Sequence, residues 1–241
     1  INNQLLLLES QRIIACQNEK IQNAVRSKEK LYSVIAHDLR APIGTLKMIL
    51  EAIDHQKEKI PDSNIKHLIK MLQETTDEAY LLLENLLLWS NSRNGVLKPV
   101  LQTFSFSEAA KDVVILQENI AEAKGIKVYN HLDKAFPVHA DLNMMKTVLR
   151  NLLSNAIKFS YTGGEINIDG EEKDGYLIVS VRDKGQGISE EHQRDLFADG
   201  LHFISYGTQK EKGSGLGLQL CKDFVKMNHG KIWFNSKEGK G

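Results

Sequence analysis

Proline, cysteine and long apolar runs are all scarce in this sequence. Four prolines and two cysteines occur among 241 residues, and residues 5–30 contain neither proline nor glycine. Cys16 and Cys221 are far apart and neither belongs to a CxxC pair, so the sequence indicates neither a disulfide framework nor a zinc site. A reducing compartment is the default for such a chain, and we expect a cytoplasmic location.

Net charge and membrane signals are lacking as well. Lys+Arg and Asp+Glu both number 31, which argues against broad nucleic-acid binding, because such binding depends on neutralising phosphates. No run of about 18 apolar residues occurs, so no segment is expected to span a bilayer. The chain begins with Ile1 and lacks a signal peptide. We therefore expect a fragment of a longer protein that contacts a membrane only through segments preceding it.

Apolar residues at helical spacing are typical of the first part of the chain. Leu7, Ile14 and Ile21 are one heptad apart, which predicts a helix that is either a solvated connection or a parallel signalling coiled coil. Further along, one apolar stripe with steps of three and four predicts a long amphipathic helix. The stripe consists of Tyr32, Ile35, Leu39, Pro42, Leu46, Ile49 and Ile53.

A second amphipathic helix follows a break at residues 61–63. Asp62 or Ser63 can cap its N-terminus, and its apolar stripe extends to Trp89 before the helix ends near residue 94. Two such helices form a hairpin that cannot bury its own apolar faces. A symmetric dimer forming a four-helix bundle buries both faces, so the sequence predicts a homodimer.

After Pro99 the pattern changes to short strands and helices. It predicts an α/β sandwich with a mixed, antiparallel-rich sheet, so the fold class of the whole chain is α+β. The predicted strands are residues 103–106, 126–131, 165–168, 176–181 and 231–236. The predicted helices are one capped by Ser107 and ending at Gly125, one capped by Asp141 and extending through Ile157, and one from Gly215 to Asn228.

The segment AHDLRAPIG, residues 36–44, contains a candidate phosphoryl acceptor. His37 lies two positions after a stripe residue, so its imidazole is expected to face solvent and to be largely neutral at cytoplasmic pH. A neutral imidazole has a lone pair that can attack phosphorus, and the carboxylate of Asp38 can hold Nδ1–H so that Nε2 is the nucleophile. Arg40 is a candidate phosphate contact, and a kink at Pro42 beside the histidine is a reason to tolerate this proline. The other histidines lack this context and are interpreted as ordinary.

A polar face on a later helix carries groups that suit phosphate and metal. Asn151, Asn155 and Lys158 are spaced by four and three residues, so they share one face. Amide oxygens can ligate Mg²⁺, and amide nitrogens can donate to phosphate oxygens. On their own, these residues are equally consistent with an ordinary polar helix face.

A DxGxG block at the end of a strand suits an adenine base. The carboxylate of Asp183 can accept a hydrogen bond from the exocyclic amine of adenine, while Gly185 and Gly187 let the backbone approach the base. The block is not a dinucleotide fingerprint, because no βαβ unit with a third glycine follows it.

A second glycine block precedes the last predicted helix. Backbone N–H groups at a helix N-terminus suit phosphate, although a glycine-rich hinge has the same composition. The candidates are Gly213, Gly215, Leu216 and Gly217. Residues 197–212 are interpreted as a mobile lid, from which Lys210 and Lys212 can reach a γ-phosphate. A P-loop is excluded, because no GxxxxGK[ST] motif occurs.

In this order, the histidine, asparagine and glycine blocks resemble the catalytic core of a sensor histidine kinase, from about Lys28 to Gly241. The resemblance implies a dimerisation and histidine-phosphotransfer domain followed by an ATP-binding domain of the fold shared with gyrase, mismatch-repair ATPases and heat-shock chaperones. The expected domains are an N-terminal signalling helix at 1–27, the histidine domain at 28–94, a linker at 95–100 and the ATP-binding domain at 101–241. In this family the last domain usually continues into one more strand.

The resemblance also implies roles for the pocket residues, with Mg²⁺ and ATP as the bound species. The residue matching Asn155 ligates the metal, those matching Asn151 and Lys158 line the phosphate side, and that matching Phe159 borders the nucleotide. The implied reaction is autophosphorylation of a histidine within a homodimer, followed by transfer to an aspartate of a response regulator.

His37 is the implied phosphoacceptor and Asp38 the implied acidic base. One position departs from the family pattern, because Ala41 stands where Thr or Asn often positions a water that dephosphorylates the regulator. We therefore expect weak phosphatase activity.

Two other functions are considered. A clamp that hydrolyses ATP without a phosphohistidine should carry a general-base Glu early in the helix that follows Asp141, where this chain has Asn151. A degenerate kinase acting as a dimeric ATP-binding scaffold should have a damaged pocket, whereas Asn155, Asp183 and the glycines are present.

Overall fold

The computed structural model describes residues 2–55, 62–93, 96–196, 206–209 and 215–241, and at some positions of the first two helices, including 37 and 38, it describes the backbone alone. The chain divides into two compact units, residues 1–82 and 83–241, which are called the helical unit and the mixed unit below. No helix of the described residues is long and apolar enough to cross a membrane.

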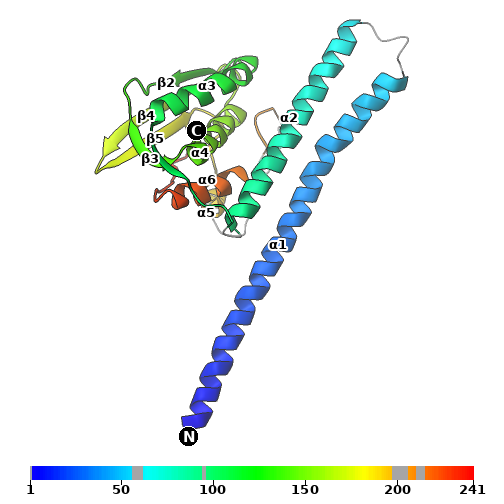
Figure 1. The fold of residues 1–241 in the computed structure, drawn as a ribbon. Coiled ribbons are helices and arrows are strands. Elements are labelled where there is room, and N and C mark those ends of the chain that lie inside the picture. Colours follow the sequence, from blue (N-terminus) through cyan, green and yellow to red (C-terminus); the bar gives the residue numbers. More distant parts are fainter. Residues whose placement is uncertain (1, 56–61, 94–95, 197–205, 210–214) are drawn as a thin grey trace. The chain divides into compact units, whose positions relative to one another are not determined.

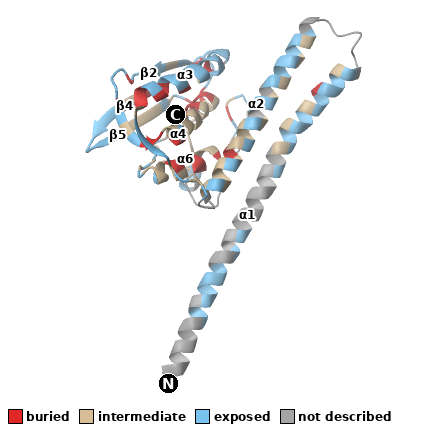
Figure 2. Cartoon of the chain, viewed as in Figure 1, coloured by how far each residue is buried: buried red, intermediate tan, exposed pale blue. Residues whose placement is uncertain are grey.

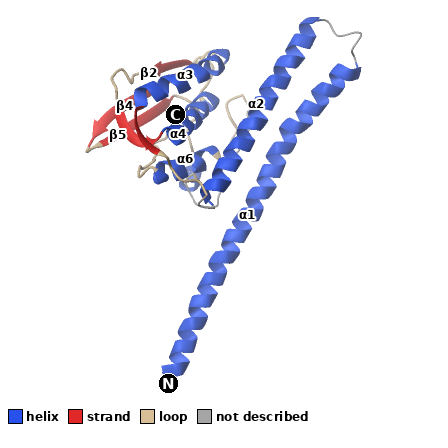
Figure 3. Cartoon of the chain, viewed as in Figure 1, coloured by secondary structure: helices blue, strands red, loops and turns tan. Residues whose placement is uncertain are grey.

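Two long helices account for the first part of the chain (Figure 1). Helix α1 comprises Asn2–His55 and α2 comprises Asp62–Arg93. As predicted, α2 ends close to residue 94, but it already begins at Asp62, so Asp62 and Ser63 lie within the helix and the predicted cap was wrong. Helix α1 continues through Pro42 and through the expected domain boundary at 27/28, so one uninterrupted helix joins those two segments (Figure 3).

Apolar side chains of α1 differ in their burial. Leu46 and Ile53, both in the predicted stripe, are half-buried, and Ile49 is buried. In contrast, Met48 is 70% exposed and Leu50 is 57% exposed. The exposed residues represent apolar surface that the described part of the chain leaves uncovered.

The mixed unit contains short strands that form two sheets in the described residues. The strands are β1 (Leu101–Ser105), β2 (Lys127–Asn130), β3 (Pro137–Asp141), β4 (Glu165–Lys173) and β5 (Tyr176–Asp183). Strand β1 pairs antiparallel with β3. In the second sheet β4 is central, with β2 parallel on one side and β5 antiparallel on the other. The predicted α+β class with a mixed sheet is therefore confirmed.

Helices α3 (Phe106–Ala123) and α4 (Leu142–Phe159) pack against the strands and enclose the main core. The short helix α5 (Glu190–Asp195) follows β5, and α6 (Gly217–Met227) packs on α4 outside this core. Leu153 of α4 and Ile166 and Ile168 of β4 are fully buried at the centre of this core. The buried red segments of Figure 2 gather here, between the helices and the strands of the mixed unit.

Three residues of this unit were predicted to cap or end a helix, and two of these predictions are confirmed. The Asp141 carboxylate caps α4 by accepting from the Met144 N–H at 2.9 Å. Gly125, with φ of 68°, ends the helical segment that began with α3. The Ser107 cap was wrong, because α3 begins at Phe106 and the Ser107 hydroxyl instead donates to the Lys134 carbonyl.

Other differences concern short elements. Strand β3 and helix α5 were not predicted, and residues 231–236, which were predicted as a strand, have no strand pairing. Ser236 in that segment is held by side chains instead, since its hydroxyl accepts from the Ile188 N–H at 2.9 Å and its carbonyl accepts from Gln193 at 3.1 Å. The predicted hairpin between β4 and β5 is confirmed, with a tight turn at Asp174-Gly175.

Candidate functional site

Helix α4 carries Asn151, Asn155 and Lys158 on one side, which is called the asparagine face below. The amphipathic pattern of α4 determines which of its side chains are buried and which form this face. Leu149, Leu153 and Ala156 point into the core and are 4% exposed or less. Asn151, Asn155 and Lys158 lie on the remaining face and are half-buried. The three side chains are thus close to the surface but partly shielded from water.

The start of α6 lies directly against Asn151. The Asn151 Nδ2 donates to the Thr147 carbonyl at 2.9 Å. A Cβ added to Gly217 would lie 2.7 Å from Asn151 Oδ1, so only a glycine fits there without a shift. Gly215, with φ of 68°, provides the turn into α6, and Leu216 is 1% exposed. The asparagine face and the second glycine block therefore meet at Asn151 and Gly217.

A second hydrophobic cluster holds α6 on α4. Met144 and Val148 of α4 pack with Leu220, Cys221 and Phe224 of α6, with partly buried side chains around them. Burial raises the pKa of the Cys221 thiol to about 12. This cysteine is a packing residue, and its neutral thiol is compatible with the apolar contacts around it.

Asp183 ends β5 with its carboxylate folded over the following turn. Its Oδ1 accepts from the Gly185 N–H at 2.8 Å. Burial raises the pKa of Asp183 above its ordinary value, and the hydrogen bond from Gly185 offsets part of that rise. A partly desolvated carboxylate of this kind makes strong hydrogen bonds to a donor that reaches it.

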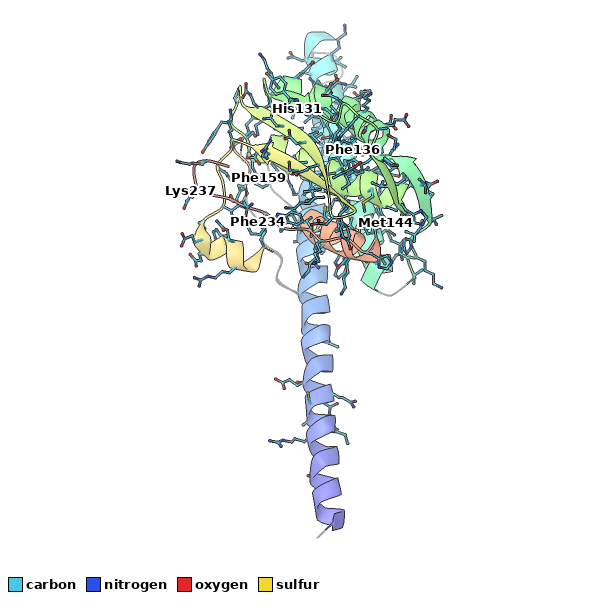
Figure 4. All side chains as sticks on the ribbon, turned by 90° about the vertical axis from the view of Figure 1, so that its left-hand side faces the viewer. His131, Phe136, Met144, Phe159, Phe234 and Lys237 are labelled. Atoms are coloured by element: carbon cyan, nitrogen blue, oxygen red, sulfur yellow. The ribbon has the colours of Figure 1, made fainter. Side chains whose placement is uncertain are left out.

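The two glycines of the DxGxG block are required by close backbone contacts. A Cβ at Gly185 would collide with the Phe159 carbonyl, and one at Gly187 with the Lys237 carbonyl. The Gln186 N–H donates to the Phe159 carbonyl at 3.1 Å, which joins this turn to the end of α4. Figure 4 labels Phe159 and Lys237 at the same end of the mixed unit.

The predicted site residues thus form two contact groups at the described positions. One group joins Asn151 with Gly217, and the other joins Phe159 with the turn that begins at Asp183. Because Asn151 and Phe159 belong to the same helix, α4 connects the two groups.

Other predicted positions cannot be placed in this geometry. Residues 210–214, which include Lys212 and Gly213, lie outside the described residues, as do the side chains of His37 and Asp38. The backbone of His37 and Asp38 belongs to α1, in agreement with the predicted helix.

Sequence analysis missed two residues that hold the end of α4. The ammonium of Lys124 donates to the Ile157 and Lys158 carbonyls, and the Thr208 hydroxyl donates to the Ser160 carbonyl. The position of Lys124 directly before the helix-ending Gly125 was the available signal. Nothing in the local pattern around Thr208 points to α4.

The donor set suits Mg²⁺ bound together with phosphates better than Mg²⁺ bound by protein alone. Among the described residues no group of three or more His, Cys, Asp or Glu side chains could hold a metal ion. Mg²⁺ commonly uses one or two protein ligands together with substrate phosphates and water. The amides of Asn151 and Asn155 on the half-buried face of α4 fit that arrangement.

Comparison with known proteins identifies a family. Residues 140–241 match the model described as histidine kinase-, DNA gyrase B-, and HSP90-like ATPase. An adaptive-response sensory kinase SasA of Prochlorococcus marinus is 30% identical over 242 residues, covering 99% of this chain and 61% of that kinase. The chain therefore spans about three fifths of the length of this curated relative.

Solved structures agree with the sequence comparison. The catalytic domain of histidine kinase ThkA is 30% identical with a TM-score of 0.50, covering 58% of this chain and 89% of that domain. A structure of ThkA in complex with the response regulator protein TrrA is 25% identical with a TM-score of 0.57, covering 92% of this chain and 63% of ThkA.

Proposed function

This chain belongs to the sensor histidine kinase family, and on that premise we propose that it transfers the γ-phosphoryl group of ATP to its own His37. The observation that carries the proposal is that α4 connects both contact groups of the pocket. One helix thereby joins a carboxylate suited to adenine with an asparagine face and glycine turn suited to phosphates. The chain ahead of this unit supplies a histidine in the AHDLR context.

The proposed reaction is an in-line phosphoryl transfer. Nε2 of His37 attacks the γ-phosphorus, a P–N bond forms, the bond to the bridging oxygen of ADP breaks, and ADP leaves. Asp38 holds Nδ1–H of the same ring and stabilises the positive charge that develops on it. Binding and alignment by the mixed unit supply most of the catalysis, because such transfers depend on positioning and electrostatics.

Pocket residues have distinct parts in this proposal. Asp183 accepts from the adenine amine, Asn155 ligates Mg²⁺, and Asn151 with Lys158 lines the phosphate side. When bound, Mg²⁺ neutralises charge on the phosphates. The backbone N–H groups after Gly215 face the phosphates at the start of α6.

We extend the proposal to a homodimer. On α1, a groove is lined by the apolar side chains of Ile43, Leu46 and Leu50 and by the charged side chains of Lys47, Glu51 and Asp54. A second copy presents the same mixture of apolar and charged groups, as a symmetric interface requires.

A response regulator is the proposed receiver of the phosphoryl group, and the cytoplasm the proposed location. Support comes from the ThkA structure, whose partner is a response regulator. The phosphohistidine is a high-energy P–N compound, so an aspartate carboxylate can take its phosphoryl group directly.

The test is incubation with γ-labelled ATP and Mg²⁺, comparing the unaltered chain with His37→Gln. We expect acid-labile label on the unaltered chain and none on the variant. A matched control is His67→Gln, which removes an exposed histidine from α2 and should leave the label unchanged.

Three results would overturn the proposal. Label that persists in His37→Gln would show a different acceptor. Inorganic phosphate released without any labelled protein would favour the hydrolytic clamp, whereas ATP binding with neither product would favour the scaffold.

A further inference from the structure

Lys124 is a lysine whose charge is buried at the end of α3. It is 5% exposed, and lysines are almost never this buried unless their ammonium has partners. Its Nζ donates to the Ile157 carbonyl at 3.0 Å and to the Lys158 carbonyl at 2.7 Å. These hydrogen bonds at the end of α4 offset part of the cost of removing the charge from water.

Those carbonyls belong to the last turn of α4, which ends at Phe159. The last carbonyls of a helix have no partner within the helix, and they form the negative end of its dipole. A buried ammonium at this point both satisfies two carbonyls and neutralises the dipole. Lys124 therefore fixes the position of the helix end from the side of α3.

Thr208 holds the same turn from another part of the chain. Its backbone N–H donates to the Lys158 carbonyl at 3.2 Å. Its hydroxyl lies 2.7 Å from the Ser160 carbonyl and 3.3 Å from the Lys158 carbonyl. A hydroxyl has one hydrogen, so it donates mainly to the nearer Ser160 oxygen.

The end of α4 is consequently held from several directions. Lys124, Thr208 and the turn after Asp183 all donate to carbonyls between Ile157 and Ser160. This stretch contains Lys158 and Phe159, both assigned to the nucleotide in the proposed function. A small rotation of this turn would move the Lys158 ammonium by much more than its backbone, because the side chain is long.

We propose that Lys124 and Thr208 are positioning residues that orient the last turn of α4, and with it the Lys158 side chain, toward the phosphates of the nucleotide. The inference rests on the proposed function and adds two residues to it. In this role both residues act through the backbone carbonyls that they hold.

The experiment measures Mg²⁺-ATP and adenosine binding by calorimetry to the unaltered chain, Thr208→Val and Thr208→Ser. Valine keeps the shape and the backbone N–H but removes the hydroxyl. We expect Thr208→Val to bind ATP about 3- to 10-fold more weakly, which is the range for one hydrogen bond, and adenosine with unchanged affinity. Thr208→Ser keeps the hydroxyl and should restore ATP affinity.

Lys124→Met is the second variant, because it removes the charge and keeps the length of the side chain. We expect a loss of ATP affinity greater than that of Thr208→Val. The matched controls are Thr162→Val and Lys127→Met, which change exposed residues near by and should leave ATP affinity unaltered.

The outcomes separate this inference from the proposed function. If the unaltered chain fails to bind ATP, the proposed function is overturned and the positioning role with it. If the unaltered chain binds ATP but Thr208→Val binds it equally well, only the positioning role is overturned. A proportional loss of ATP and adenosine affinity would also overturn it, since that result indicates general damage to the unit.

Discussion

The mixed unit and the helical unit bury their apolar side chains to very different extents. Leu153 and Ile166 of the mixed unit are 0% exposed, whereas Met48 and Leu50 of the helical unit are 70% and 57% exposed. Two layers of helix and sheet allow the mixed unit to enclose a core from one chain. Two helices cannot do so, and in the proposed homodimer a second copy covers the apolar side chains that they leave exposed.

The same leucine-to-alanine substitution should have very different effects in the two units. Leu153→Ala should lower the free energy of unfolding of the mixed unit by about 2–5 kcal/mol, because it creates a buried cavity. Leu50→Ala, in the helical unit, should change the free energy of unfolding of the mixed unit by less than about 0.5 kcal/mol. Urea unfolding followed by tryptophan fluorescence measures both, and equal effects would contradict the difference between the units.

A charge on the exposed face tests what covers the helical unit. Leu50→Asp would place two carboxylates in each dimer interface, so we expect the Kd of the dimer to rise about 10- to 100-fold. Sedimentation equilibrium measures this Kd, and an unchanged value would exclude this face from the interface. Leu116→Asp is the matched control, because Leu116 is 70% exposed on α3 of the mixed unit and its substitution should leave the Kd unchanged.

A change in the pocket of the mixed unit should separate binding from stability. Asp183→Asn removes a charge-assisted acceptor, so ATP should bind about 10- to 100-fold more weakly. Burial raises the folded-state pKa of Asp183 above its ordinary 3.8. The folded unit therefore binds this proton more tightly than the unfolded chain does, and ionised Asp183 costs stability at neutral pH.

Two measurements test the raised pKa of Asp183 and its effect on stability. Asp183→Asn should unfold at the same or a higher urea concentration, because the cost of burying the charge is gone. Adenosine, which has no titrating phosphate, should bind the unaltered chain more weakly as pH falls toward the raised pKa, and its binding to Asp183→Asn should stay flat. Unchanged ATP affinity in the variant would contradict the adenine contact.

The smallest effect is expected from a substitution in the helical unit. Ala41 is exposed on α1, four residues after His37, and has no polar atom in its side chain. Ala41→Thr supplies a hydroxyl that can position a water, so dephosphorylation of the response regulator should rise several-fold from a low level. Loss of label from a phosphorylated regulator over time measures it, and an unchanged rate would contradict the predicted role of position 41.

Long periodic segments were the parts of this fold that could be predicted best. The apolar spacing of α4 and its Asp141 cap are local features, and both were predicted correctly. Strand β3 was missed because it is short and begins with Pro137, and it is held by pairing with β1. Residues 231–236 have the composition of a strand, yet hydrogen bonds from Ile188 and Gln193 to Ser236 take the place of strand pairing.

In the candidate site, too, some residues could be predicted from local spacing and others could not. Spacing by itself determined that Asn151, Asn155 and Lys158 share one face, since helical geometry depends only on neighbours along the chain. In contrast, Lys124 and Thr208 meet at the end of α4 because of the way the chain folds. Their hydrogen bonds join residues 33 to 50 positions apart, and donors brought together by packing over such separations leave no periodic pattern in the sequence.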